Sequence, residues 1–342
     1  MTDIKSFQSF DAAAQASLKF LQNRLGMDLW MVTRTEGEDW IVLQIEDQSY
    51  GVKQGAVFNW ADSFCSRMTR GLGPRIAPRS QEVPAYAAAP IGQQVKIGAY
   101  VGIPLTRSDG SLFGTLCAID PTPQPESLVN ELPLVELISS LLCSVLEAEM
   151  KTQSETRFTE RALAEQLMDS LTGLYNLRGW TKLATAEEQR CQRYGHPACV
   201  LSIDLDSLKL VAHKQGQEKA DEYLCRAAKA IRSAVRATDI VARTGEDKIA
   251  VLGIECDEFN VRKMMDRVSG ALDDAKMSAS IGIATRNPKL SISNALVQAD
   301  EMMYRCKRIR NKNVLSSGFG ESDDGSNEVL CLRLNVDRSG AR

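Results

Sequence analysis

The sequence is poor in the residue types that build metal centres and hydrolase sites. Only two histidines, His196 and His213, occur among 342 residues. A His-rich metal site or a Ser-His-Asp triad is therefore not expected. The nine cysteines are scattered and form no CxxC pair. An odd, dispersed set of this kind is typical of reduced thiols, so we expect a cytoplasmic protein.

The sequence also lacks long apolar runs and a large net charge. The longest apolar stretch, 134–146, is short and contains Glu136, whereas a membrane span needs about 18 residues with few charges. The N-terminus lacks the basic-then-apolar order of a signal peptide. With a net charge of -3, general attraction to nucleic acid or to anionic membranes is not expected. A phosphorylated ligand would have to be held by a local cluster of Arg and Lys.

What is present is ordinary globular composition, with 44% hydrophobic and 25% charged residues. A chain of this length predicts about two domains. The first half favours an α+β sheet domain, because a helical pattern is followed by alternating strands and then by a second helix. Asp109-Gly110 predicts a hairpin turn. The expected elements are a helix over 8–25, strands within 28–45, a helix over 58–68, strands over 100–105 and 111–119, and a helix over 134–146.

This half resembles the GAF family in the segments 101–105 (VGIPL), 109–120 (DGSLFGTLCAID) and 62–65 (DSFC). The resemblance implies a GAF-like α/β sandwich over 5–146 that acts as a sensory domain. Domains of this family bind varied small molecules or mediate dimerisation, so the ligand is not identified. Residues 147–168 are polar and predict a helical linker that continues the preceding helix. It is a candidate stalk for a homodimer.

The second half, 169–315, alternates strands with helices in a ferredoxin-like pattern. Strands are expected over 198–204, 240–244, 249–254 and 277–284, and helices over 176–194, 216–235, 258–273 and 292–309. This half resembles the GGDEF family, the diguanylate cyclases, in the segments 169–176 (DSLTGLYN), 203–209 (IDLDSLK), 280–284 (SIGIA) and 299–307 (ADEMMYRCK). The resemblance implies a nucleotide-cyclase-like GGDEF domain.

The resemblance also implies a chemistry: two GTP molecules condense to cyclic di-GMP with the help of divalent metals. Carboxylates are the hard oxygen ligands that such metals require. Asp204 and Asp247 stand at the family's metal positions. Mg²⁺ is expected as a cofactor only if a nucleotide binds at these positions, which form the active site in the family. Otherwise no cofactor is expected.

The signature itself departs from the family. GGDEF is replaced by Gly245-Glu246-Asp247-Lys248-Ile249. Glu246 adds a negative side chain where the second glycine would face the triphosphate, and Lys248 reverses the charge of the fourth-position acid. We therefore predict a degenerate site in which no catalytic residue is active.

Positions that would bind guanine and phosphate are also altered. The family's Asn-Asp pair reads Ala212-His213, and its late Gly-Arg-Asn reads Arg310-Asn311-Lys312. Asp221 and Lys307 are retained and would be residual nucleotide contacts. The combined losses predict inefficient GTP condensation.

One ligand motif is intact. Arg236-Ala237-Thr238-Asp239 matches the family's RxxD inhibitory motif, and Arg267 matches its auxiliary arginine. The resemblance implies binding of cyclic di-GMP, because Arg offers a planar fork to phosphate and Asp accepts from guanine. The alternative is a surface ion pair between Arg236 and Asp239.

Three functions are consistent with these features. The first is a cyclic di-GMP receptor or regulator acting through RxxD, with an unidentified protein partner. The second is a diguanylate cyclase with low residual activity that uses GTP, and the third is a ligand-free dimeric scaffold. The tail, 316–342, begins with a polar stretch, and its alternating residues 330–336 predict a strand. This strand either docks on a sheet edge or on a partner, or packs loosely at the end of the chain.

Overall fold

A computed structural model describes residue 7 and residues 9–163 and 165–316. The strand expected at 330–336 lies outside the described residues. The chain divides near Thr159 into two compact units.

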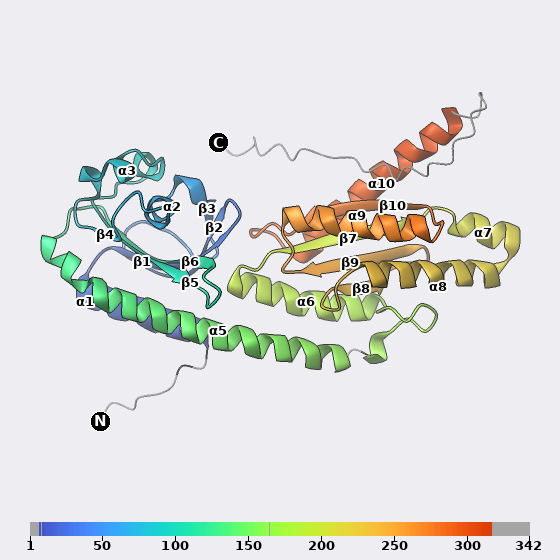
Figure 1. The fold of residues 1–342 in the computed structure, drawn as a ribbon, viewed down its shortest axis with the longest axis horizontal. Helices are drawn as coiled ribbons and strands as arrows, with labels where there is room; N and C mark the ends of the chain where they lie inside the picture. Colours follow the sequence, from blue (N-terminus) through green and yellow to red (C-terminus); the bar gives the residue numbers. More distant parts are fainter. Residues whose placement is uncertain (1–6, 8, 164, 317–342) are drawn as a thin grey trace. The chain divides into compact units, whose positions relative to one another are not determined.

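The first unit is built on a six-stranded antiparallel sheet with strand order β3-β2-β1-β6-β5-β4 (Figure 1). Its long hairpin joins β5 to β6 through the expected Asp-Gly turn, where Gly110 has a φ of 81°. The strands are β1 (Leu29–Glu36), β2 (Asp39–Asp47), β3 (Val57–Asn59), β4 (Ile76–Ala77), β5 (Ala99–Thr106) and β6 (Leu112–Asp120).

Helices cover both faces of this sheet. On one face, α1 (Phe10–Leu25) and the first part of α5 (Leu132–Leu163) bury apolar side chains against β1, β5 and β6. The other face is covered by short helices, α2 (Phe64–Thr69), α3 (Pro84–Ala87) and α4 (Ile91–Gln94). Beneath them Phe64 stacks on Tyr86 at 4.8 Å between ring centroids, and the Tyr100 hydroxyl donates to the Cys65 sulfur at 3.3 Å. These aromatic side chains belong to the buried core between the sheet and the short helices.

The helix expected over 58–68 is wrong in its first half. Residues 57–59 pair with β2 as a strand, and a helical turn at Trp60–Asp62 ends before α2 begins. Two local caps explain the break. The Asn59 side chain accepts from the N–H of Ala61, and the Ser63 hydroxyl accepts from the N–H of Ser66, so each short helix has its own start.

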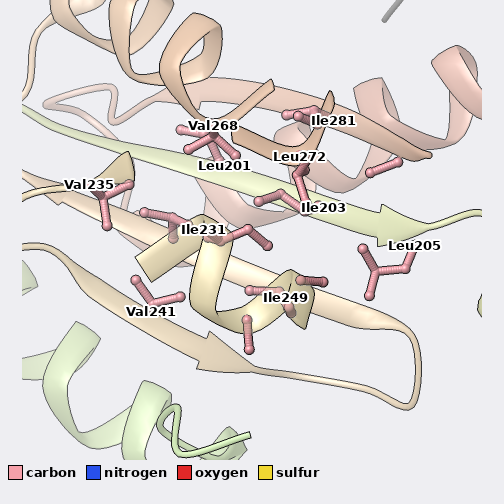
Figure 2. Packing of buried hydrophobic residues seen from close by; sticks show 14 of the residues in the cluster. Leu201, Ile203, Leu205, Ile231, Val235, Val241, Ile249, Val268, Leu272 and Ile281 are labelled. Carbon is pink, nitrogen blue, oxygen red and sulfur yellow. The ribbon is translucent and has the colours of Figure 1, made fainter. Parts of the chain in front are cut away.

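The second unit contains a four-stranded antiparallel sheet with strand order β10-β7-β9-β8. Helices α8 and α9 pack on one face, and Figure 2 shows the Leu, Ile and Val side chains of that core. Helices α6 and α10 pack on the other face. The elements are α6 (Leu177–Tyr194), β7 (Ala198–Leu205), α7 (Leu208–Gln215), α8 (Gln217–Ala234), β8 (Ile240–Arg243), β9 (Lys248–Ile254), α9 (Glu258–Asp274), β10 (Ala279–Thr285) and α10 (Ile292–Ser316).

Alternation along β7 decides which residues face α10. Leu201, Ile203 and Leu205 point into the core shared with α8 and α9. Ser202 and Asp204 therefore face the opposite helix layer. Helix α10 lies very close to β10, because a Cβ on Gly282 would stand 2.0 Å from the Ala299 carbonyl oxygen. Glycine at this position lets α10 carry its polar side chains over the end of β7.

Helix α5 ends at Leu163, earlier than the predicted limit of 168, and a helical turn at Glu165–Leu167 follows. Leu137 and Leu141 are 57% and 58% exposed on its surface. The stretch Glu126–Leu163 is long and apolar enough to pass a length and composition test for a membrane span, contrary to our expectation. One such helix is weak evidence for a membrane, since an amphipathic helix with a partly buried face passes the same test.

Candidate functional site

The end of β7 brings a buried carboxylate against a lysine of α10. Asp204 is 3% exposed, and its Oδ1 lies 2.6 Å from Nζ of Lys307. Asp206, two residues on, accepts from the Arg310 guanidinium at 2.6 Å and from the Ser280 hydroxyl at 2.9 Å. Both acids of this segment thus have cationic partners from the same helix.

The altered signature forms the turn between β8 and β9. Arg243, the last residue of β8, donates to the carbonyls of Gly245 and Glu246 at 3.1 Å each. Its guanidinium also lies 3.3 Å from Asp169 of the entry motif. Hydrogen bonds from Thr172 and the charge of Arg243 lower the pKa of Asp169, although burial alone would raise it. Arg243 therefore fixes the turn and ties it to the start of the domain.

Lys248 opens β9 directly opposite Asp204 in the strand register. Its ammonium donates to the Tyr304 hydroxyl at 2.6 Å and lies 3.9 Å from Asp300. Burial alone would lower the pKa of Lys248, but the hydrogen bond to Tyr304 and the charge of Asp300 outweigh it and raise the pKa. The position that carries an acid in the family thus holds a stable cation.

Asp247, the remaining signature acid, lies 3.2 Å from Nζ of Lys209, whose side chain is 78% exposed. The backbone carbonyl of Asp247 accepts from the N–H of Leu205, which holds the turn beside the end of β7. Lys209 is part of the β7 motif, but we assigned it no role from the sequence.

The ion pairs of these three aspartates bear on whether divalent cations can bind to them. A metal ligand must offer free carboxylate oxygens, yet Asp204, Asp206 and Asp247 are each engaged by a cation of the chain itself. Among the described residues, no group of three or more His, Cys, Asp or Glu side chains could hold a metal. A divalent ion at these acids would therefore compete with cations of the chain itself. The expected metal role of Asp204 and Asp247 stays a prediction.

The expected guanine contacts lie on the neighbouring helices. Ala212 and His213 belong to α7, a helix we did not predict, and Asp221 lies on the first turns of α8. Asp221 accepts from the Gln217 side chain at 2.7 Å. The side chain of Asn311 lies outside the described residues, but Arg310, one position earlier, supplies the guanidinium that reaches Asp206.

The RxxD residues lie together on the turn between α8 and β8. Arg236 and Arg267 are exposed, and Arg267 donates to the Ala234 carbonyl at 3.0 Å. Asp239 is only 2% exposed. Its Oδ2 accepts from the N–H of Arg236 at 2.8 Å, and its Oδ1 accepts from the N–H of Ile254 at 3.2 Å.

In this conformation Asp239 stabilises the turn through the backbone. No ion pair between the Arg236 and Asp239 side chains is among the contacts of the described residues. The expected role of Asp239 as an acceptor for guanine stays a prediction, because the carboxylate is buried within the turn.

A cavity of about 260 Å³ lies behind the RxxD turn. Arg161 and Arg232 line it together with Asp239, and Met168, Leu174 and Val241 are among its apolar residues. Neither arginine was recognised from the sequence. Arg161 precedes the entry motif in a polar helix whose charges look interchangeable, so no sequence signal marked it.

Comparisons with known proteins agree with this architecture. Residues 9–146 match the GAF domain model, and residues 166–313 match the model described as diguanylate cyclase, GGDEF domain. The chain is 23% identical to diguanylate cyclase DgcP of Escherichia coli (strain K12) over 319 residues, which is 89% of this chain and 92% of that protein. It is 30% identical to diguanylate cyclase DosC of the same strain over 161 residues, which is 44% of this chain and 35% of that protein.

Among solved structures, the GGDEF domain of DgcB from Caulobacter crescentus in complex with c-di-GMP is 19% identical to this chain, with a TM-score of 0.40. The match covers 42% of this chain and 88% of that one. A likeness at this level carries no argument about activity.

Proposed function

We propose that this protein, a GAF–GGDEF protein of the diguanylate cyclase family, has lost efficient GTP condensation and acts as a cyclic di-GMP receptor or regulator. Membership of cyclic di-GMP signalling follows from the family. The loss of turnover and the receptor role are the proposal. We further propose that the protein is cytoplasmic and dimeric.

One observation carries the loss of turnover: the cation Lys248 takes the place of a signature acid, directly opposite Asp204 in the sheet. Its ammonium bonds the Tyr304 hydroxyl at 2.6 Å and lies 3.9 Å from Asp300. A carboxylate that could help to hold a divalent ion is therefore missing at this position. The ammonium of Lys248 would also repel a divalent cation there.

The receptor role is supported by two exposed arginines, Arg236 on the RxxD turn and Arg267 on α9, whose side chain donates to the Ala234 carbonyl just before that turn. Cyclic di-GMP carries two phosphates, and guanidinium groups bind phosphate through paired, charge-assisted hydrogen bonds. Arg236→Ala should weaken cyclic di-GMP binding roughly 10–100-fold, since a hydrogen bond to a charged group contributes about 1.5–3 kcal/mol.

Asp204→Ala, in the former metal site, is the matched control and should leave the affinity for cyclic di-GMP unchanged. Titration calorimetry of the full chain with cyclic di-GMP separates the two sites. The reverse pattern would locate the ligand in the former active site and refute the receptor role of the RxxD turn.

A second candidate is a diguanylate cyclase with low residual activity. The comparisons favour it over the receptor role, because the relative that aligns over 89% of this chain is named a diguanylate cyclase. Incubation with GTP and Mg²⁺ or Mn²⁺, followed by chromatography, distinguishes them. Sustained formation of cyclic di-GMP would favour the enzyme, whereas cyclic di-GMP binding without turnover would favour the receptor. A chain that did neither would be a scaffold.

A further inference from the structure

All the backbone carbonyls of the RxxD tetrapeptide accept hydrogen bonds from arginine side chains. Arg232 donates to the carbonyl of Asp239 at 2.8 Å and to the carbonyl of Arg236. Arg161 donates to the carbonyl of Ala237 at 2.9 Å and to the carbonyl of Thr238. One guanidinium holds the two outer carbonyls and the other holds the two inner ones.

The two arginines come from different elements. Arg232 lies in the last turn of α8, next to Ile231, which is fully buried in the core of the domain. Arg161 lies near the end of α5, the helix that links the two domains. Arg232 therefore attaches the turn to its own domain, and Arg161 attaches it to the linker helix.

The end of α5 is itself held in a defined position. Glu160, the neighbour of Arg161, accepts from the Arg190 guanidinium of α6 at 2.6 Å. Arg190 is 6% exposed and also bonds Glu187 at 2.7 Å. Because this ion pair is partly buried, it fixes the helix end more firmly than an exposed pair would, and Arg161 is held opposite the turn.

We propose that Arg161 is a positioning residue that shapes the RxxD turn for its ligand and couples ligand binding there to the position of the linker helix. The inference rests on the proposed binding of cyclic di-GMP at this turn. A guanidinium is a planar fork that can hold two carbonyls at a fixed spacing. A turn held in this way presents Arg236 in one arrangement, so less ordering is required when a ligand binds.

The coupling acts in both directions. If the position of α5 changes the affinity of the turn for cyclic di-GMP, the ligand must change the stability of the α5 end by the same factor. The linker helix thereby offers a physical route between the GAF domain and the ligand turn, through a contact that lies wholly within the second unit.

The test uses the full chain and three variants: Arg161→Ala, Arg161→Lys and, as a control on the same helix, Lys151→Ala, whose side chain is exposed. Calorimetry should show cyclic di-GMP binding weakened about 5–20-fold in Arg161→Ala, as expected for loss of charged hydrogen bonds at a partly exposed site. Arg161→Lys should recover part of the affinity, because an ammonium can still reach one carbonyl. Lys151→Ala should bind like the unaltered chain.

Hydrogen exchange provides a readout that does not depend on affinity. Without ligand, the Asp239 amide, which donates to the Arg236 carbonyl at 3.1 Å, should exchange faster in Arg161→Ala and at the normal rate in Lys151→Ala. With cyclic di-GMP, exchange at residues 158–163 should slow in the unaltered chain and not in Arg161→Ala.

Unchanged exchange at the turn in Arg161→Ala would overturn the positioning role, and unchanged affinity would overturn the coupling. If the unaltered chain bound no cyclic di-GMP, the proposed receptor function would fail together with the coupling. The ligand-free exchange data would then still decide whether Arg161 shapes the turn.

Discussion

Removal of the Asp239 carboxylate should destabilise the GGDEF domain, although the sequence motif marks this residue as a ligand contact. The carboxylate is 2% exposed and accepts from two backbone N–H groups, those of Arg236 and Ile254. Asp239→Ala leaves both donors without this acceptor. The Ile254 bond is buried and joins the turn to the end of β9, so water cannot readily replace the lost partner.

A buried donor that loses its acceptor costs about 1–3 kcal/mol. Two such donors, one of them only partly buried, give an expected loss of roughly 2–4 kcal/mol in the free energy of unfolding. Asp239→Asn should lose about half as much, because the amide oxygen still accepts one bond while its NH₂ group faces the other donor.

Hydrogen exchange measured at increasing urea concentrations determines the loss in the free energy of unfolding of the GGDEF domain. Peptides covering β7 and β9 report the unfolding of the GGDEF core separately from that of the GAF domain. The difference in urea midpoint between the variant and the unaltered chain, multiplied by the urea dependence of the unfolding free energy, gives the loss.

Arg236→Ala is the control, since this side chain is exposed and its removal should change stability by less than about 0.5 kcal/mol. If Asp239→Ala were as stable as Arg236→Ala, the carboxylate would not hold the turn, and its assignment to backbone stabilisation would be wrong.

Three further outcomes are expected. The pKa of Asp169 is lowered from 3.8 in the fold, so the Asp169 carboxylate stabilises the fold above pH 3.8, and this contribution is lost as the pH falls through the lowered pKa. In acid titrations, the difference in stability between the unaltered chain and Asp169→Asn should therefore close below about pH 3.8. A constant difference would contradict this. Lys248→Glu places a carboxylate beside Asp204, so Mg²⁺ should raise the melting temperature of this variant and not that of Lys248→Met; equal shifts in both variants would refute the expectation that an acid at this position is needed to hold a divalent ion. Leu141, 58% exposed on α5, should contribute to a dimer interface, so light scattering should show a smaller mass for Leu141→Glu than for the unaltered chain. The prediction fails if the unaltered chain is already monomeric at tens of micromolar, a range set by typical weak-dimer affinities.

Local patterns in the sequence determined the elements of both domains. Short apolar runs predicted the strands β7 and β9, and helical patterns predicted α8 and α9, because each signal is carried by neighbouring residues. Prediction failed where side-chain caps override periodicity. Asn59 and Ser63 split an expected helix, and α7 is a short helix with a weak apolar face that was read as part of the preceding motif.

The sequence also determined which residue types occupy the altered signature. Lys248 and Glu246 are visible as departures without any structure. Their partners are not, because the contact between Lys248 and Tyr304 joins residues 56 positions apart and depends on how closely α10 packs over Gly282.

Only the tertiary structure decided how the RxxD turn is built. The motif marked Arg236, Asp239 and Arg267 as ligand contacts, but burial turned the Asp239 carboxylate toward the backbone. Arg161 reaches the turn from 76 residues away in sequence. Its side chain resembles every other charge on an exposed helix until the fold brings that helix end beside the carbonyls of Ala237 and Thr238, to which it donates.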